Sequence, residues 1–525
     1  MSSSAHPDSS RRFLFWTCFV SLVATSFGFI SRAFLLGDWG PAFNLSETQL
    51  GEIFGAGLWP FAISIVIFSL VVDKIGDRNG LWFAFICHIV SAVMTIMATG
   101  YQSLYWAAFV GALGNGAVEA VINPAVATVY PKEKTKWLNI LHAGWPCGLM
   151  IAGALTIMLG DVHWKVKAAL IFLPAIAYGI MLLKCHFPVN ERVAAGVSYR
   201  DMLKEPGGLG IGIVAILVIC EMGRVFAAMA GVATPWAALI IASVVVAVVY
   251  GLYVKSFGRP MYIFMLVVML LLATTELGTD GWIKELMGPA MELIGLNSGW
   301  ILVYTATLMM VLRFLTGPIL RITKLSPLGL LAVSCVMVII GIVTLSKIST
   351  EAGVAILLAS TIYGAGQCFF WPTTLGFIAE RFPKGGALTL NAIAGVGMLG
   401  VGILGGPWLG YIQNTTIETS LAESAPGIYE VVSGDEKESL FGKYRPIDEK
   451  RLEAHAETLP TEEARDAFKG EVVGVREQAK RDALFKVSSL PLIMLICYAG
   501  LMVYFRMKGG YKPIELSQSE QGTAA

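Results

Sequence analysis

The sequence predicts an all-α polytopic membrane protein with fourteen membrane-spanning helices. Of the 525 residues, 56% are hydrophobic and only 14% are charged, against about 25% charged residues in an average soluble domain. Fourteen apolar stretches are each about as long as the twenty residues that cross a bilayer. Lys and Arg gather in alternate short loops, as the positive-inside rule requires. This composition excludes an ordinary soluble enzyme, and a net charge of +1 gives no reason to expect a nucleic-acid partner.

The apolar stretches fall into groups of six, two and six, which predicts two six-helix bundles with two extra helices between them. The predicted parts are a tail over 1–12, a first bundle over 13–185, a linker over 186–208, the extra helices over 209–254, a second bundle over 260–506 and a tail over 507–525. The individual stretches are 13–36, 47–72, 81–99, 104–130, 136–159, 165–185, 209–229, 233–254, 260–280, 298–320, 327–346, 351–378, 386–412 and 487–506.

The distribution of Lys and Arg predicts that both termini are cytoplasmic, with the protein in the cytoplasmic or inner membrane. Residues 413–486 then form a large extracytoplasmic loop, which holds 27 of the 75 charged residues. Charge-alternating stretches over 447–458 and 461–486 are typical of helices. This loop is either a cap over the outer mouth or a solvated insertion.

The two groups of six resemble internal copies of each other. Leu138 and Asn139 are followed by Gly148, and Leu390 and Asn391 are followed by Gly400 at the same spacing. Repeated halves are typical of secondary transporters, whose substrate site lies between the repeats near the bilayer midplane.

The loop after the second stretch carries an acid, bases and a glycine in close succession. It resembles the signature loop of the major facilitator superfamily, whose fold is two six-helix bundles, and the resemblance implies that such loops latch the halves on the cytoplasmic side. The equivalent loop of the second half keeps a glycine and bases. A loop that only sets membrane orientation is the alternative. The residues concerned are Asp73, Lys74, Gly76, Arg78 and Arg321.

A carboxylate lies in the middle of the fourth stretch. Glu119 and Asn123 are four residues apart and share a helix face. An ionised acid at that depth is costly, so it faces a cavity or a partner, or it is protonated. Together with His142 and Trp145, the pattern resembles the fucose and glucose/galactose proton-symporter branch of the superfamily. The resemblance implies proton coupling by Glu119 and sugar binding by Asn123 and His142.

In the second half, Gln367 and Trp371 lie one helical turn apart. A tryptophan ring and an amide lining a wet cavity suit a sugar ring and its hydroxyls. Helix packing by the tryptophan is the alternative interpretation.

The fucose branch uses an acid in its first helix, where this chain has Arg32. The repeat offset predicts that Arg32 faces Thr279 or Asp280, with Glu52 and Glu276 at similar depth. Three interpretations stay open: a structural ion-pair cluster, a gate, or an anchor for an anionic substrate.

The sequence therefore predicts a transporter of a small polar solute by alternating access, with sugar:proton symport as the expected activity. The alternatives are an organic-anion transporter that uses Arg32 and a non-transporting membrane sensor. No nucleotide-binding loop or metal-ligand spacing is present, so we expect no enzyme activity and no cofactor. The expected partners are the solute, the proton and the lipid bilayer, with a monomer as the functional unit.

Overall fold

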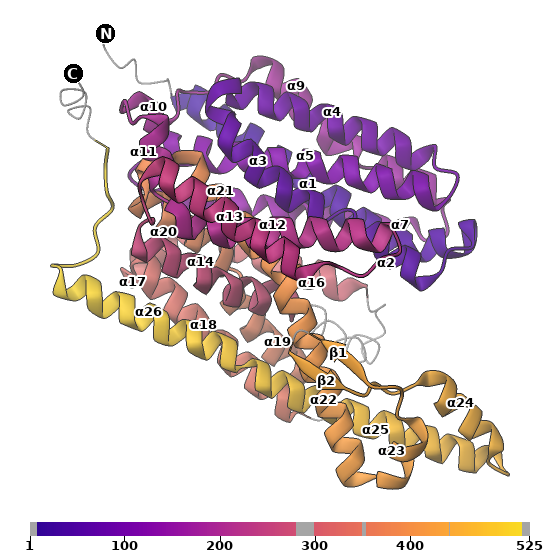
Figure 1. Cartoon of the computed structure of the whole chain (residues 1–525). Helices are drawn as coiled ribbons and strands as arrows, with labels where there is room; N and C mark the ends of the chain where they lie inside the picture. Colours follow the sequence, from indigo (N-terminus) through magenta and orange to yellow (C-terminus); the bar gives the residue numbers. More distant parts are fainter. Residues whose placement is uncertain (1–7, 280–298, 349–352, 440, 517–525) are drawn as a thin grey trace.

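The computed structural model describes residues 8–279, 299–348, 353–439 and 441–516. Almost all of this part is helical, and the helices run roughly side by side in two bundles (Figure 1). Thirteen described helices are long and apolar enough to cross a membrane, or fourteen if the bent pair α16 and α17 is one span. The predicted membrane fold and the number of spans are therefore confirmed. Asp280 lies outside the described residues.

The first bundle contains the six predicted spans, and three of these spans are broken. Ala143 interrupts the fifth span between α6 and α7, a turn over 56–58 interrupts the second between α2 and α3, and a turn over 170–171 interrupts the sixth between α8 and α9. The elements are α1 (Asp8–Phe43), α2 (Glu47–Gly55), α3 (Trp59–Ile75), α4 (Asp77–Ile96), α5 (Tyr101–Val129), α6 (Lys134–His142), α7 (Gly144–Leu159), α8 (Trp164–Ala169) and α9 (Phe172–Lys184).

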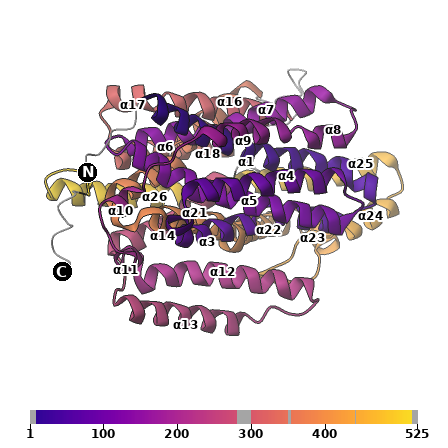
Figure 2. The ribbon, with the colours of Figure 1, turned by 90° about the horizontal axis from the view of Figure 1, so that it is seen from above.

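The linker contains α10 (Glu191–Ala194) and α11 (Tyr199–Lys204). It leads to α12 (Gly207–Met229) and α13 (Trp236–Val254), which pack on each other. Figure 2 shows this pair along one edge of the molecule. Only 11% of the apolar window of α13 is buried, so most of α13 is left to face lipid.

The second bundle contains more breaks than the first. Its first and fifth spans include the π-helical turns η1 (Thr274–Gly278) and η3 (Val401–Gly405), and α16 bends by 54° into α17. The other elements are α14 (Pro260–Ala273), α16 (Trp300–Phe314), α17 (Thr316–Thr323), α18 (Pro327–Lys347), α19 (Gly353–Gln367), α20 (Phe370–Arg381), η2 (Pro383–Gly385), α21 (Gly386–Gly400), α22 (Gly406–Ser424) and α26 (Ser489–Met507).

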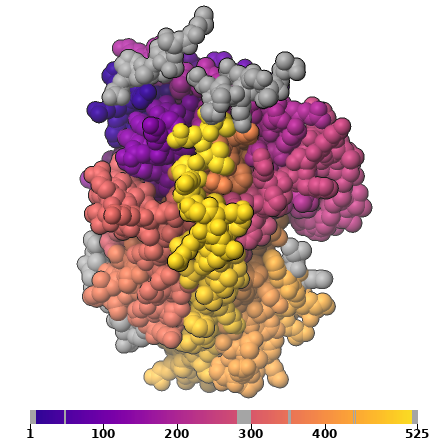
Figure 3. Space-filling model, turned by 90° about the vertical axis from the view of Figure 1, so that its left-hand side faces the viewer, coloured from indigo at the N-terminus to yellow at the C-terminus, as the bar shows by residue number. Residues whose placement is uncertain are grey.

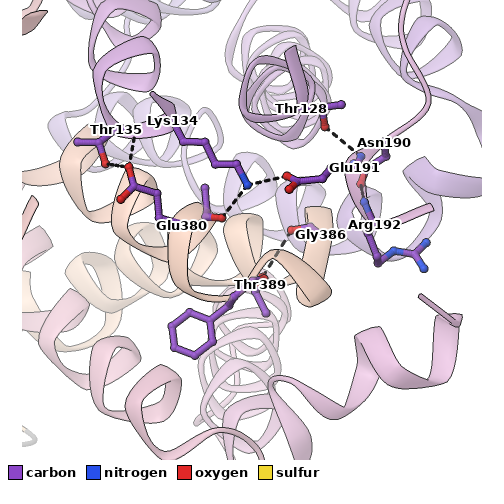
Figure 4. A network of polar contacts seen from close by, with 11 residues as sticks. Thr128, Lys134, Thr135, Asn190, Glu191, Arg192, Glu380, Gly386 and Thr389 are labelled. Atoms are coloured by element: carbon purple, nitrogen blue, oxygen red, sulfur yellow. Dashed lines mark hydrogen bonds and ion pairs between the residues drawn. The ribbon is translucent and has the colours of Figure 1, made fainter. Parts of the chain in front are cut away.

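We call the end of the molecule where α1 begins and α26 ends the terminal face, and the opposite end the loop face (Figure 1). At the terminal face the two bundles are tied together through α6 and α20 (Figure 4). Lys134 donates to Glu191 (2.6 Å) and to the carbonyl of Ala379 (3.2 Å). The Glu380 carboxylate accepts bonds from the amide (3.1 Å) and hydroxyl (2.6 Å) of Thr135. This end of the molecule is closed.

The chain after α26 returns along the terminal face and binds to the end of α20. The Tyr511 hydroxyl donates to Glu380 (2.6 Å), and the Ile514 amide donates to the Glu380 carbonyl (2.8 Å). Burial and the neighbouring Glu380 carboxylate raise the pKa of Tyr511, so this hydroxyl is protonated at neutral pH and acts as the donor.

The charged segment between α22 and α26 folds as a small unit on the loop face. It contains α23 (Pro426–Val432), a hairpin of β1 (Lys437–Ser439) and β2 (Gly442–Tyr444), α24 (Glu449–Thr458) and α25 (Glu462–Val487). The helices expected over 447–458 and 461–486 are present. Leu421, Val432, Leu452 and Val472 form its buried core. In Figure 3 it lies at the bottom of the view, where the yellow of α26 meets the orange segment. It packs on α18 and α22 of the second bundle.

Candidate functional site

A small cavity lies between the two bundles and takes five wall residues from each. Its volume is about 60 Å³, which is room for about two water molecules and far below the usual 300–1,000 Å³ of a ligand pocket. A solute larger than water therefore requires the walls to separate. The wall residues are Phe61, Ile65, Glu119, His142 and Trp145 from the first bundle, and Glu276, Leu277, Arg313, Trp371 and Met398 from the second.

The predicted first-bundle residues are brought together, with Glu119, His142 and Trp145 on one wall and Asn123 behind it. The Asn123 amide donates to the Glu119 carboxylate (2.7 Å), and the Asn123 oxygen lies 3.0 Å from Nε2 of His142. All three side chains are at least 95% buried. Trp145 lies beside them and stacks on Phe61, with ring centroids 6.4 Å apart. Helix spacing explains the first contact, because residues four apart share a face.

The second wall is organised by Arg313, a residue that the sequence analysis does not single out. Its guanidinium donates to Glu276 (3.4 Å), to the carbonyl of Cys368 (2.7 Å) and to the carbonyl of His142 (2.8 Å). The last bond crosses from the second bundle to the first. Glu276 faces inward from the π-helical turn η1, a distortion that is common at functional sites.

Both carbonyls are available to Arg313 because each lies four residues before a proline. In a continuous helix they would accept from residues 146 and 372, but Pro146 and Pro372 have no amide hydrogen. The helices break there, between α6 and α7 and between α19 and α20. Inside a membrane such carbonyls need another donor, and the guanidinium supplies it for both. The two prolines were the sequence signal for this arrangement.

We call Glu119, Asn123, His142, Glu276 and Arg313 the central cluster. It forms one chain of polar contacts from α5 through His142 to α16 and η1. Its charged groups are two carboxylates and one guanidinium. With Glu119 ionised the cluster carries a net charge of −1, and with Glu119 protonated it is neutral.

Of the two residues predicted to bind the solute in the second bundle, one lines the cavity and the other does not. Trp371 lines the cavity, next to Gly397 of α21. Gln367 is buried but is not among the wall residues of this cavity.

The group predicted around Arg32 does not assemble. Glu276 binds Arg313, and Glu52 accepts a hydrogen bond from the Tyr101 hydroxyl (2.5 Å). Arg32 lines a different cavity, inside the first bundle. Thr279 bonds to Thr275 and Tyr363 instead of facing Arg32, which α1 presents to α4 and α5. The expected contact with Asp280 falls outside the described residues.

The signature-loop residues lie at the terminal face, with partners that differ from the expected ones. Asp73 binds Arg192 of the linker through two nitrogens (2.5 and 3.1 Å), not an arginine of the second bundle. Lys74 lies over the Tyr199 ring at 4.6 Å, and Arg78 donates to the Leu183 carbonyl. Gly76 has φ of 85° between α3 and α4, a conformation that favours glycine. Arg321 is exposed on α17.

The fold of two helical bundles agrees with the comparison to known proteins. A model of the Major Facilitator Superfamily matches residues 14–407. The chain belongs to the Major Facilitator Superfamily. This is a family of transporters, which are not enzymes, and its members are integral multi-pass membrane proteins.

Individual relatives are distant. A hexuronate transporter of Bacillus subtilis (strain 168) is 25% identical over 174 residues, which are 33% of this chain and 40% of that protein. The chain thus matches less than half the length of this curated relative. Among solved structures, the proton:xylose symporter XylE with bound 6-bromo-6-deoxy-D-glucose is 12% identical, with a TM-score of 0.60 over 98% of this chain and 99% of that one. FucP in the outward conformation is 15% identical, with a TM-score of 0.50 over 75% and 92%. At these identities the likeness shows that the chain shares their fold.

Proposed function

We propose that the protein is a secondary transporter that carries a small neutral sugar or polyol together with a proton. The observation that carries the proposal is the position of Glu119, a buried carboxylate on the wall of the cavity between the bundles. The tryptophans Trp145 and Trp371 on opposite walls supply flat apolar surfaces for a sugar ring. His142 supplies a polar group for a hydroxyl, and Asn123 holds its ring from behind the wall.

In this proposal the central cluster joins the proton to the movement of the bundles. Protonation of Glu119 removes a buried charge and leaves Arg313 balanced by Glu276 alone. The backbone of His142 accepts from Arg313 while its ring contacts Asn123, which in turn holds Glu119. Separation of the walls breaks the Arg313–His142 bond. Because Glu119 is linked to that bond through Asn123 and His142, its protonation state biases the equilibrium between the closed and the separated walls.

The closed terminal face fits one end state of alternating access. We propose that this face is cytoplasmic, as the loop charges predict. The contacts that Asp73, Lys134 and Glu380 make there act as the gate on that side. The cavity then receives its solute from the loop face, after the walls separate.

Proton flux into proteoliposomes with a lumenal pH dye tests the proposal. We expect a neutral hexose gradient to acidify the lumen with the unaltered protein and not with Glu119→Gln. Glu52→Gln is the matched control, because Glu52 is exposed and remote from the cavity wall. If folded Glu119→Gln still concentrates the hexose, Glu119 is not the proton-coupling residue.

A sugar acid is a second candidate solute, favoured by the guanidinium of Arg313 on the cavity wall and by the likeness to a hexuronate transporter. The charge balance favours the neutral solute, because the two carboxylates already outnumber the arginine. Glucuronate in place of glucose in the same assay separates the two. Acidification by glucuronate alone, above a protein-free control, would replace the neutral sugar with the sugar acid.

A further inference from the structure

A second cavity lies wholly inside the first bundle, and no residue of the central cavity borders it. Its volume is about 50 Å³. One stripe of α1 supplies much of the wall, with Gly28, Ser31, Arg32, Leu35 and Trp39 at helical spacing. Ala24 of α1 also borders it, and the rest comes from α4, α5, α8 and the turn after α8, through His88, Ser91, Ala92, Thr95, Gly111, Asn115, Ala168 and Ile171.

Three hydrogen-bond donors on this wall have no partner among the described residues. They are NH1 of Arg32, the hydroxyl of Ser31 and Nε1 of Trp39. Their residues are 91%, 95% and 98% buried. Most buried polar groups are paired, so three unpaired donors on residues that line one cavity point to an occupant that accepts hydrogen bonds. NH1 of Arg32 lies against Gly57, whereas NH2 of the same guanidinium lies beside Gly111 of the cavity wall.

Other hydroxyls of α1 show that Ser31 is not an ordinary helix serine. Ser21, Thr25 and Ser26 each donate to a carbonyl three or four residues back on α1. The Ser31 hydroxyl makes no such bond, although the same kind of carbonyl is within reach of a helical serine. Its hydrogen-bonding capacity is left for the cavity.

Arg32 carries a positive charge that its surroundings do not balance. An arginine stays protonated in proteins, and a buried charge without a counter-ion is costly. Among the described residues no carboxylate forms an ion pair with Arg32, and Asp38 on the same helix binds Lys167 at 3.1 Å. Gly57, just beyond α2, leaves room for the guanidinium, since a Cβ there would lie 1.9 Å from NH1. The carbonyl end of α2 offers at most about half an elementary charge.

The neighbouring polar groups add both a donor and acceptors. His88 contacts the Asn115 oxygen through Nε2 (2.9 Å) and the Tyr178 hydroxyl through Nδ1 (3.0 Å). Because Asn115 gives its oxygen to His88, its NH₂ group is what remains for the cavity. The Ser91 hydroxyl donates to the Ala107 carbonyl (2.6 Å) and the Thr95 hydroxyl donates to the Ser91 carbonyl (2.8 Å), so both hydroxyl oxygens are left as acceptors. The positive charge of Arg32, rather than an excess of donors, therefore favours an anion in this cavity.

We propose that this cavity is a binding site for a small inorganic monovalent anion, of the size of chloride or bromide, held by Arg32, Ser31 and Trp39. The volume accepts one such ion or one to two waters and excludes an organic anion. Because every wall element belongs to the first bundle, the ion stays bound while the bundles move. It balances Arg32 within the membrane and is distinct from the transported solute.

Binding of ³⁶Cl⁻ to the purified full-length protein, with gluconate as the replacement anion, tests the site. We expect saturable binding that bromide displaces, and a melting temperature that rises with chloride at constant ionic strength. Trp39→Phe and Ser31→Ala each remove one donor with little change of shape, and we expect each to weaken chloride binding about 5-fold. Arg32→Gln is expected to abolish binding. Trp106→Phe, at an exposed tryptophan of α5, is the matched control and should bind as the unaltered protein does.

Two results would overturn the proposal. Absence of saturable ³⁶Cl⁻ binding by folded protein would mean that the cavity holds water alone. Unchanged affinity in both Trp39→Phe and Ser31→Ala would place any bound chloride elsewhere. If Arg32→Gln fails to fold, Trp39→Phe and Ser31→Ala still test the proposal.

Discussion

Arg313 and Arg32 are both buried arginines in membrane spans, yet their surroundings differ. Arg313 contacts a carboxylate and two carbonyls, and one of those carbonyls belongs to the other bundle. Arg32 has an unpaired nitrogen and no ion pair among the described residues, and its cavity lies within a single bundle. An arginine bound across the interface is sensitive to movement of the bundles, whereas one enclosed in a bundle is not. The comparison separates a residue suited to conformational change from one suited to holding an ion.

The largest effect that this comparison predicts is at Arg313. Arg313→Gln leaves Glu276 charged and buried without its guanidinium, and it withdraws donors from two carbonyls. We expect a loss of about 3–5 kcal/mol in stability and loss of transport, measured by thermal unfolding and uptake. The double variant Glu276→Gln/Arg313→Gln removes both charges and should regain part of the stability. A double variant no more stable than Arg313→Gln would show that the carbonyl bonds, not the ion pair, dominate.

Arg192 is an intermediate case, since it is buried and paired but binds Asp73 in the last turn of α3, within the same half of the molecule. Asp73→Asn removes one partner of a pair whose two side chains are each 5% exposed. We expect a loss of about 3 kcal/mol and faster protease cleavage of the linker at the terminal face. Asp201→Asn, at an exposed linker residue, is the control and should change neither property.

The returning tail gives a smaller effect. Tyr511→Phe removes the hydrogen bond to Glu380 while keeping the ring, which packs on Phe377 and Phe505. We expect a loss of about 1 kcal/mol, measured by thermal unfolding. An equal loss in a Tyr511→Ala variant would mean that the ring packing contributes nothing.

The smallest effect is expected at Glu52, which sequence analysis grouped with Arg32. Glu52→Gln retains an acceptor for the Tyr101 hydroxyl at an exposed site, so stability should change by less than about 0.5 kcal/mol. A loss of several kcal/mol in stability would instead support an ion-pair cluster that includes Glu52 at the loop face.

Much of the fold is predictable because membrane spans are set by length and apolarity. The contact between Glu119 and Asn123 is predictable as well, since it follows from helix spacing. The contacts of Arg313 were missed because they depend on tertiary structure: three helix breaks bring His142, Cys368 and Glu276 to one point. An arginine within an apolar span, with prolines four residues after His142 and Cys368, was the available signal. The surroundings of Arg32 were not predictable, and Glu276 and Thr279 have other partners, because repeat offsets do not fix which way a side chain faces.

The folded segment between α22 and α26 has a practical consequence for imaging. Its own buried core and its packing on α18 and α22 attach it to the second bundle. An antibody fragment raised against α24 and α25 would therefore add recognisable mass to a small particle and guide its alignment in electron microscopy. Since the fragment would move with the second bundle, a fluorophore on it and another on the first bundle would follow their relative rotation in single molecules.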